Sequence, residues 1–481
     1  MSSFPESGFT TIVLSDLHLT EEQVPDTKNL LWKKFKTKEY FFDQDFSDML
    51  DYQMRSVDGK IELVLNGDIF DFDSVTKYPE KPTFKVSPFE KHNTMFSQLE
   101  KSIFKMDVII DAHPIWFKAL TKFVKAGHRL IFTIGNHDLE LHYDEVQRIV
   151  RKAILDNPDG QERIRFCEWF YISHKDTHIE HGHQYDPFCV CQTPVNPFIK
   201  VHQDIRVRIP FGNMTARYMV NRMGFINPHA EENYSMTLAE YTRFFFRFLI
   251  RRQPLIIWTW FSSAVVIAYR SILYRLREPV SNPLAYEEKV EAIAKKSNAS
   301  PKIVRELLTL AAPSAVSSPW SIMQVLWIDR AILFLIGTGL TLQLFLVLDQ
   351  LIDVQFYWML IPILGLAPFF IFYTSTVKNR LTGSKNLSGD RMRWVGLVTG
   401  ANRVVFGHTH EVKHEIIGLI EYLNPGSWSP IFEDYECKKS LTRYLYVKIC
   451  PEDSEEGRVA YLNEWKDGQE IDYYTGKKPG S

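Results

Sequence analysis

Five short polar stretches, each placed at or near the end of an apolar run, constrain the fold of this chain more than any other feature. The central stretch is Gly135-Asn136-His137-Asp138, which follows the apolar residues 130–134. A strand that stops abruptly at polar residues places their side chains at the carboxyl edge of a sheet, where open α/β folds bind ligands. We therefore expect the five stretches to meet in one pocket. The other four are Asp16-Leu17-His18, Gly67-Asp68-Ile69-Phe70-Asp71, His181-Gly182-His183 and Gly407-His408-Thr409-His410.

The alternation of apolar and amphipathic segments in the first 185 residues predicts an α/β fold. Such alternation favours a parallel or mixed sheet that helices cover on both faces. Residues 77–93, rich in Pro and Lys, predict a long loop, and residues 458–465 predict an edge strand. The hairpin-like runs 163–166 and 169–172 predict two paired strands. Further strands are expected at 11–14, 61–65, 130–134 and 177–180, and helices at 45–54, 115–124 and 144–155.

Length and composition exclude several classes of protein. The 481 residues, 45% of them hydrophobic, suffice for one large core or two smaller ones. A formal net charge of −2 excludes a strongly basic nucleic-acid binder, so no nucleic-acid partner is expected. The five cysteines lack the spacing of a secreted scaffold, and no signal peptide precedes Asp16, so we expect a reducing compartment. Cys189 and Cys191 are interpreted as small buried or half-buried thiols, with metal binding as the alternative.

Two uncharged runs between His183 and His408 predict a transmembrane hairpin. Residues 331–348 and 354–377 each have the length of a membrane span, roughly 20 residues. The alternative is a pair of buried core helices. Arg330 precedes the first run and Lys378 follows the second, whereas the connector is acidic. Because excess Lys and Arg mark the cytoplasmic side, both ends of the hairpin are expected in the cytoplasm.

A third apolar segment, residues 255–274, is bracketed by arginines and contains Trp258. If His181 and His408 reach the same metal ions, the number of crossings between them must be even. We therefore expect this segment, with residues 241–252 before it, to lie in the membrane interface. A membrane crossing and a soluble amphipathic helix are the alternatives. Residues 286–296 and 301–310 predict a helical hairpin. The basic residues between 200 and 222 are expected to face anionic lipid or phosphate, with a solvated face as the alternative.

The polar residues of the five stretches have the composition of a site for two divalent metal ions. Asp16 and His18 lie two residues apart, so a continuing strand would place both on one side, where they can chelate one ion. Asp68 has two carboxylate oxygens and is the natural bridge between ions held roughly 3.5–4 Å apart. The remaining expected ligands are Asn136, His181, His408 and His410, the last two divided between the ions.

A dinuclear centre of this kind also indicates a reaction. One hydroxide between the ions has a depressed pKa and attacks phosphorus while both cations neutralise phosphate oxygens. We expect His137 to protonate the leaving oxygen and Asp138 to orient and charge that imidazole. Manganese, iron and zinc all suit the ligand set. The sequence therefore predicts a metal-dependent phosphohydrolase.

The series of motifs resembles the calcineurin-like metallophosphoesterase family over residues 10–185 and 395–450. The resemblance implies a four-layer α/β/β/α sandwich, here split by a large helical, membrane-associated insertion at 186–394 between the parts 1–185 and 395–481. It favours His181 over His183 as a ligand, which leaves His183 either behind the metal ligands or near the substrate. The turn that contains Asn424 and Ser427 is similar to one that lies close to the family's site, so both residues are expected to contact substrate. The resemblance assigns Asp16, His18, Asp68 and His410 to one metal and Asp68, Asn136, His181 and His408 to the other.

Within the family, Asp16-Leu17-His18-Leu19, residues 67–71 and the position of the insertion look like the UDP-2,3-diacylglucosamine diphosphatases of lipid A synthesis. This likeness implies manganese, with iron or zinc as alternatives, and a bacterial-type inner membrane with a cytoplasmic catalytic domain. The chain departs from these enzymes at His137, where they carry Arg. Their cap is also far shorter and lacks a membrane hairpin.

Three functions follow from these patterns. The first is a phosphohydrolase that cleaves a phosphoester or pyrophosphate of a lipid-linked substrate, such as UDP-2,3-diacylglucosamine, at the bilayer. The second is a membrane-tethered phosphodiesterase that acts on a soluble nucleotide or other small phosphoester. The third is a scaffold without activity, which predicts missing metal ligands. Because every ligand position is filled, the sequence favours an enzyme.

Overall fold

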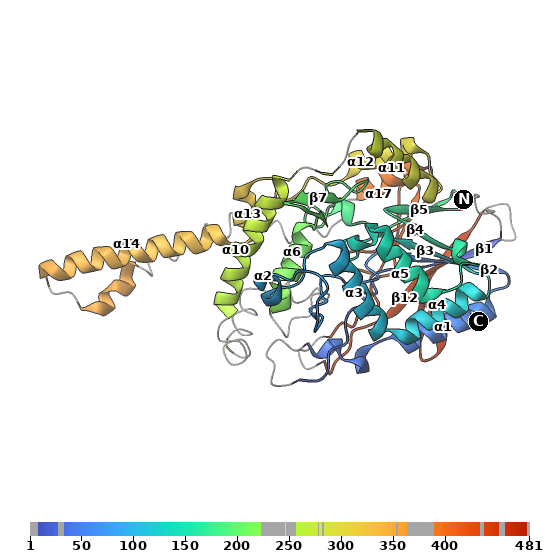
Figure 1. Cartoon of the computed structure of the whole chain (residues 1–481), viewed down its shortest axis with the longest axis horizontal. Helices are drawn as coiled ribbons and strands as arrows, with labels where there is room; N and C mark the ends of the chain where they lie inside the picture. The colour runs from blue at the N-terminus through green and yellow to red at the C-terminus, as the bar shows by residue number, and fades with distance from the viewer. Residues whose placement is uncertain are drawn as a thin grey trace.

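The computed structural model describes residues 8–26, 33–222, 246, 256–277, 279–280, 283–352, 355–362, 389–432, 437–451 and 457–478 (Figure 1). The predicted α/β class is confirmed, because the described residues form sheets with both parallel and antiparallel pairs among many helices. Residues 241–252, apart from residue 246, lie outside the described part of the chain. So does most of the predicted second span at 354–377.

The first sheet is mixed and carries three of the predicted site stretches. β1 to β4 run parallel to one another, whereas β12 to β14 add antiparallel strands on the other side of β1. β2 is buried at every position after Lys60, as expected of a parallel strand that is covered on both faces. In sheet order the strands are β14 (Gln469–Asp472), β13 (Val459–Lys466), β12 (Tyr444–Cys450), β1 (Phe9–Leu14), β2 (Lys60–Asn66), β3 (Arg129–Thr133) and β4 (Ile164–Cys167).

The second sheet carries the other two stretches. Its central strands β6 and β9 are parallel, and antiparallel strands flank the parallel group. In sheet order it contains β10 (Lys413–Ile417), β11 (Ile420–Asn424), β9 (Arg403–Val405), β6 (Thr177–Glu180) and β5 (Phe170–Ser173).

Alternating side chains build the cores on the two faces of the first sheet. Val64 of β2 belongs to an apolar cluster that also contains Ile179 and Val405 of the second sheet. Its neighbours Leu63 and Leu65 point the other way, into a cluster with the helices. These helices are α1 (Asp43–Ser56), α3 (Leu99–Ala112), α4 (Pro114–Lys125) and α5 (Asp144–Ile154).

Two predictions in this part of the chain are wrong, and a third is right only in part. Residues 163–166 and 169–172 do not form a hairpin, because the short link between β4 and β5 carries the chain from one sheet to the other. Residues 458–465 form β13, which is an inner strand, because β14 pairs with its far side. The expected loop at 77–93 contains the short helix α2 (Pro88–His92), which begins with a capping box between Ser87 and Glu90.

The insertion shares apolar cores with the two sheets and their helices. Met214 and Ala264 belong to the same apolar cluster as the helices on the first sheet. The predicted helical hairpin at 286–296 and 301–310 is confirmed, and it packs with α17 against the second sheet. The elements are β7 (Phe198–Val201), β8 (Asp204–Val207), α6 (Phe211–Tyr218), α10 (Ile256–Arg275), α11 (Pro283–Lys296), α12 (Pro301–Leu310), α13 (Pro319–Val325), α14 (Ile328–Ile352) and α17 (Gly389–Thr399).

The helix α14 projects away from the body of the protein (Figure 1). Within the described ranges it is the one helix long and apolar enough to cross a membrane. Only 6% of its most apolar 18-residue stretch is buried in the protein. A core helix of a soluble protein would be mostly buried, so the structure does not favour the alternative of a core helix for residues 331–348. The 25 residues of α14 correspond to about 37 Å at about 1.5 Å per residue.

Candidate metal centre

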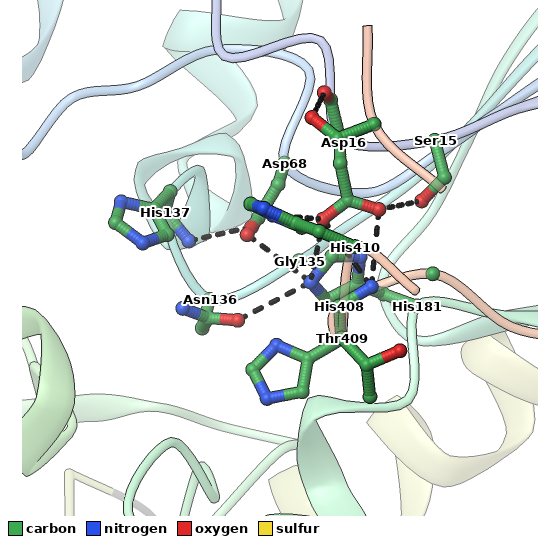
Figure 2. A network of polar contacts seen from close by, with 12 residues as sticks. Ser15, Asp16, Asp68, Gly135, Asn136, His137, His181, His408, Thr409 and His410 are labelled. Carbon is green, nitrogen blue, oxygen red and sulfur yellow. Dashed lines mark hydrogen bonds and ion pairs between the residues drawn. The ribbon is translucent and has the colours of Figure 1, made fainter. Parts of the chain in front are cut away.

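The structure brings the polar stretches together at the carboxyl edges of β1, β2, β3, β6 and β9 (Figure 2). All seven predicted metal ligands lie in this one cluster. Two groups of side chains have ligand atoms within 4.8 Å of one another and match the predicted division between two ions. The first group is Asp16, His18 and His410, and the second is Asp68, His181 and His408.

In the first group the imidazole nitrogens face one another. His18 Nε2 lies 3.2 Å from His410 Nε2, and His410 Nε2 lies 3.1 Å from Asp16 Oδ1. Ligand atoms that bind one ion at about 2.1 Å are separated by about 3 Å, so this spacing fits a shared cation. Ser15 Oγ donates a hydrogen bond to Asp16 Oδ2 at 2.5 Å, and this bond fixes the orientation of the Asp16 carboxylate.

In the second group Asp68 and Asn136 converge on one imidazole. His181 Nε2 lies 3.1 Å from Asp68 Oδ2 and 3.2 Å from the amide oxygen of Asn136. His18 Nε2 of the first group lies 3.9 Å from the same Asp68 oxygen. Asp68 therefore lies between the two groups, which is the place of a bridging carboxylate.

The backbone at these ligands is unusual. Asp16, His18, Asp68, His408 and His410 all have φ between 50° and 67°, in the left-handed region that residues other than Gly rarely adopt. Such conformations persist where the surrounding structure imposes them, and they gather at functional sites. Five of the seven predicted ligands share this feature.

Two glycines allow the ligand loops to approach closely. A Cβ on Gly407 would lie 1.8 Å from Ser15 Oγ and 2.4 Å from Asp16 Oδ2. A Cβ on Gly135 would lie 2.4 Å from the backbone nitrogen of Asp68. The loops after β3 and β9 therefore need glycine at these positions to lie against the first two ligand loops.

The electrostatics of the site fit a cation centre. Burial raises the pKa of the Asp68 carboxyl, but the charges of His181 and His137 outweigh this effect and hold that pKa well below its usual value. Asp16 shows the same balance, with His181 and His410 lowering its pKa. Both carboxylates are thus ionised and buried, which is the state that metal ligands require.

His137 has carboxylate partners that the sequence did not predict. Its Nδ1 lies 3.2 Å from Asp71 Oδ1 and 3.0 Å from Asp73 Oδ2. Its ring is 4.9 Å from that of His18, so it stands beside the first metal group. Burial lowers the pKa of His137, but the nearby Asp68 and Asp71 charges raise it well above its usual value.

The expected role of Asp138 is therefore corrected. Its carboxylate accepts hydrogen bonds from the backbone N–H groups of Ile69 and Gly135 at 2.9 and 2.6 Å. These bonds tie the loop after β3 to the loop after β2. Burial, with the charge of Asp68, raises the pKa of Asp138 to about 7. The sequence did not reveal this structural role of Asp138, because adjacent residues in a loop, such as His137 and Asp138, project in different directions.

The three residues expected at the substrate have different surroundings. His183 is buried, and its ring lies 5.5 Å from that of His181, beside the second group. Asn424 and Ser427 support the ligand loops through hydrogen bonds to the backbone, and their contact with substrate stays a prediction. Asn424 Nδ2 donates to the carbonyl of Gly407 at 2.8 Å, and Ser427 Oγ donates to the carbonyl of Asp16 at 2.8 Å.

Asp186 orients the ligand His408. Its Oδ2 lies 2.9 Å from His408 Nε2, which leaves Nδ1 of the ring for a metal. A carboxylate on the second ring nitrogen fixes the orientation of a metal-binding histidine. Cys189 forms a further possible metal-binding group with Asp186 and His408. Burial, with the Asp186 charge, raises the pKa of the Cys189 thiol well above its usual value. In the described chain, Cys191 belongs to no such group.

We expect Asp186→Asn to weaken metal binding about 10- to 100-fold, because the imidazole of His408 would lose its orienting charge. Isothermal titration of the apoprotein with Mn²⁺ measures the change. Glu421→Gln is the matched control, since Glu421 lies at the same 2.9 Å from His414 but far from the ligands. Equal affinity in both variants would contradict this role of Asp186.

Comparison of the chain with protein-family models, curated proteins and solved structures finds no match.

Proposed function

We propose that this protein is a dinuclear-metal-dependent phosphohydrolase of the calcineurin-like metallophosphoesterase type that acts on a lipid-linked substrate at the membrane surface. The observation that carries the proposal is the pair of ligand groups on either side of Asp68, with His137 beside them. Two manganese ions are the proposed cofactors, with iron or zinc as alternatives. The apolar cluster that joins the two sheets supports the four-layer sandwich expected of this family.

When bound, the two ions would activate water and neutralise the charge of the phosphoryl oxygens. The protein's own residues complete the reaction. His137 is 15% exposed at its side chain, so it can reach a substrate, and Asp71 and Asp73 hold its imidazole. We assign it the transfer of a proton to the leaving oxygen. His183, buried beside the second ligand group, limits the space on that side of the phosphate.

The surface of the insertion supports a location at the bilayer. Exposed aromatic residues stand at both ends of α14: Trp320 and Trp327 before it, and Tyr357 and Trp358 after it. Tryptophan and tyrosine at the two ends of a span are typical of the membrane interfaces. A cytoplasmic orientation remains part of the proposal, as does the hairpin, whose second half lies outside the described residues.

The predicted interfacial segment 255–274 forms the helix α10. One face packs into the body through Ala264 and Ile267, while the opposite face exposes Trp258, Val265 and Tyr269. A stripe of this kind next to a membrane span is suited to the headgroup layer. α10 would then bring the catalytic domain against the lipid surface.

The test is hydrolysis by the protein purified in detergent. We expect activity with Mn²⁺ on UDP-2,3-diacylglucosamine or another lipid pyrophosphate in mixed micelles, loss with a chelator, and recovery when Mn²⁺ is restored. Soluble nucleotides and aryl phosphodiesters serve as comparison substrates. Faster hydrolysis of a soluble nucleotide would overturn the lipid assignment. If the protein binds Mn²⁺ but hydrolyses none of these substrates, the proposal that it is an enzyme is wrong.

A further inference from the structure

Two buried side chains of the insertion reach the catalytic loop. Asn213 and Arg217 lie one turn apart on α6, and each is only 1% exposed. Residues four apart share one face of a helix, and here that face points toward Asn136 and Asp73. The insertion thus contributes groups to the surroundings of the metal centre.

Asn213 fixes the amide of the metal ligand Asn136. Its Nδ2 donates to the backbone carbonyl of Asn136 at 2.9 Å, and its Oδ1 accepts from the side-chain amide nitrogen of Asn136 at 3.3 Å. The amide oxygen of Asn136 is thereby turned toward His181, where the second ion is expected. Without Asn213, the amide of Asn136 could rotate.

Arg217 balances the charge around His137. Its guanidinium pairs with Asp73 and, at 2.6 Å, with Glu140. Asp73 and Asp71 both face the imidazole of His137, and two carboxylates in a buried site are costly unless a cation compensates them. Asn213 also fixes Asp73, because Asn213 Nδ2 donates a hydrogen bond to Asp73 Oδ2 at 2.5 Å.

The helix α6 is in turn attached to the proposed membrane-facing helix. Ser271 of α10 contacts the sulfur of Met214 in α6 at 3.6 Å. Arg222, in the turn that follows α6, donates to Ser262 and Ser263 of α10 at 3.3 and 3.2 Å. A chain of direct contacts therefore runs from α10 through α6 to the loop of His137.

We propose that Asn213 and Arg217 are positioning residues: Asn213 orients the ligand Asn136, and Arg217 holds Asp73 against His137, the proton donor to the leaving group. The insertion is therefore part of the support of the active site as well as a membrane anchor. The role of Arg217 rests on the proposed function, whereas the role of Asn213 concerns metal binding and can be tested without turnover.

The first experiment compares leaving groups. The substrates are a phosphodiester with 4-nitrophenol, which leaves readily as the anion, and one with phenol, which needs a proton. We expect Asp73→Asn and Arg217→Met to lower kcat on the phenyl ester about 100-fold and to change kcat on the nitrophenyl ester by less than about threefold. Arg217→Lys should restore most of the activity on the phenyl ester.

The matched control is Asp204→Asn, because it removes the partner of Arg206, another buried arginine, at 2.7 Å. It should leave both substrates unaffected. An equal fall on both substrates in the Arg217 and Asp73 variants would overturn the proposal, since a merely structural role does not distinguish leaving groups. Asp73→Asn preserves the shape of the side chain, so it remains informative where Arg217→Met fails to fold.

The second experiment needs no activity. Calorimetric titration with Mn²⁺ should show about 10-fold weaker binding in Asn213→Ala and unchanged binding in Asp73→Asn. Unchanged binding in Asn213→Ala would overturn the role of Asn213. Failure of the proposed function is a separate result. Wild-type protein that binds Mn²⁺ but hydrolyses neither these esters nor a lipid pyrophosphate contradicts the proposed activity, and with it the role of Arg217. The measured effect of Asn213→Ala on Mn²⁺ binding does not depend on that outcome.

Discussion

Asp68→Ala is expected to abolish activity and to leave the protein without its second bound metal ion. Asp68 is buried and lies between the two ligand groups. Its Oδ2 is 3.9 Å from His18 Nε2 and 3.1 Å from His181 Nε2. Removal of a bridging carboxylate takes a ligand from both ions, and stabilisation by such ions is worth several kcal/mol of the barrier. We expect kcat/KM to fall at least about 1,000-fold. Metal analysis after gel filtration, together with hydrolysis assays, measures both effects.

The control for this variant is Glu180→Gln. Glu180 is fully buried and directly precedes the ligand His181, but its carboxylate binds Trp169 Nε1 at 2.6 Å and Tyr185 Oη at 3.0 Å, away from the ligands. It should retain both metal ions. Two tightly bound ions and near wild-type turnover in Asp68→Ala would show that the centre is not built around this carboxylate.

The convergence of the predicted ligands could be foreseen from the sequence because these residues lie just after strand ends. Asp16, Asp68 and Asn136 come after β1, β2 and β3, which are neighbouring parallel strands and so end at the same edge. Apolar runs reveal such strands in a sequence, and the polar residues after them mark the edge. The local pattern therefore contained the information that placed these side chains together.

The partners of the ligands could not be predicted in this way. Asp186 follows no apolar run, and Asn213 and Arg217 belong to a helix of the insertion whose position depends on tertiary packing. The basic residues between 200 and 222 were expected to face anionic lipid, phosphate or solvent, yet Arg217 is buried in ion pairs. Asp73 follows the stretch 67–71 by two residues, and this spacing was the one local signal that it could join Asp71 at His137.

The link between β4 and β5 illustrates a second limit. Two short apolar runs separated by a few residues have the pattern of a hairpin. Phe166 nevertheless lies in the first sheet and Phe170 in the second. Each strand finds its neighbours through the packing of the whole domain, β4 beside β3 and β5 beside β6. Pairing between sheets is a long-range property that local periodicity does not contain.

Leu340→Arg is expected to remove the protein from the membrane fraction. Leu340 lies near the middle of α14, and its side chain is 63% exposed, with little protein to cover it. An arginine at the centre of a spanning helix opposes insertion by about 2.5–3.5 kcal/mol, which is roughly a 100-fold change in the equilibrium. Flotation of cell membranes on a density gradient, with detection of the protein in each fraction, measures the loss.

A matched control separates this effect from a general loss of solubility or folding. Leu419 is 92% exposed in the turn between β10 and β11 of the second sheet, away from α14. Leu419→Arg adds the same charge next to the second sheet and should leave the protein with the membranes. Since α14 makes few contacts with the body, Leu340→Arg should preserve Mn²⁺ binding in detergent. If Leu340→Arg floats with the membranes as the wild type does, α14 does not span the bilayer, and attachment must come from another surface of the insertion.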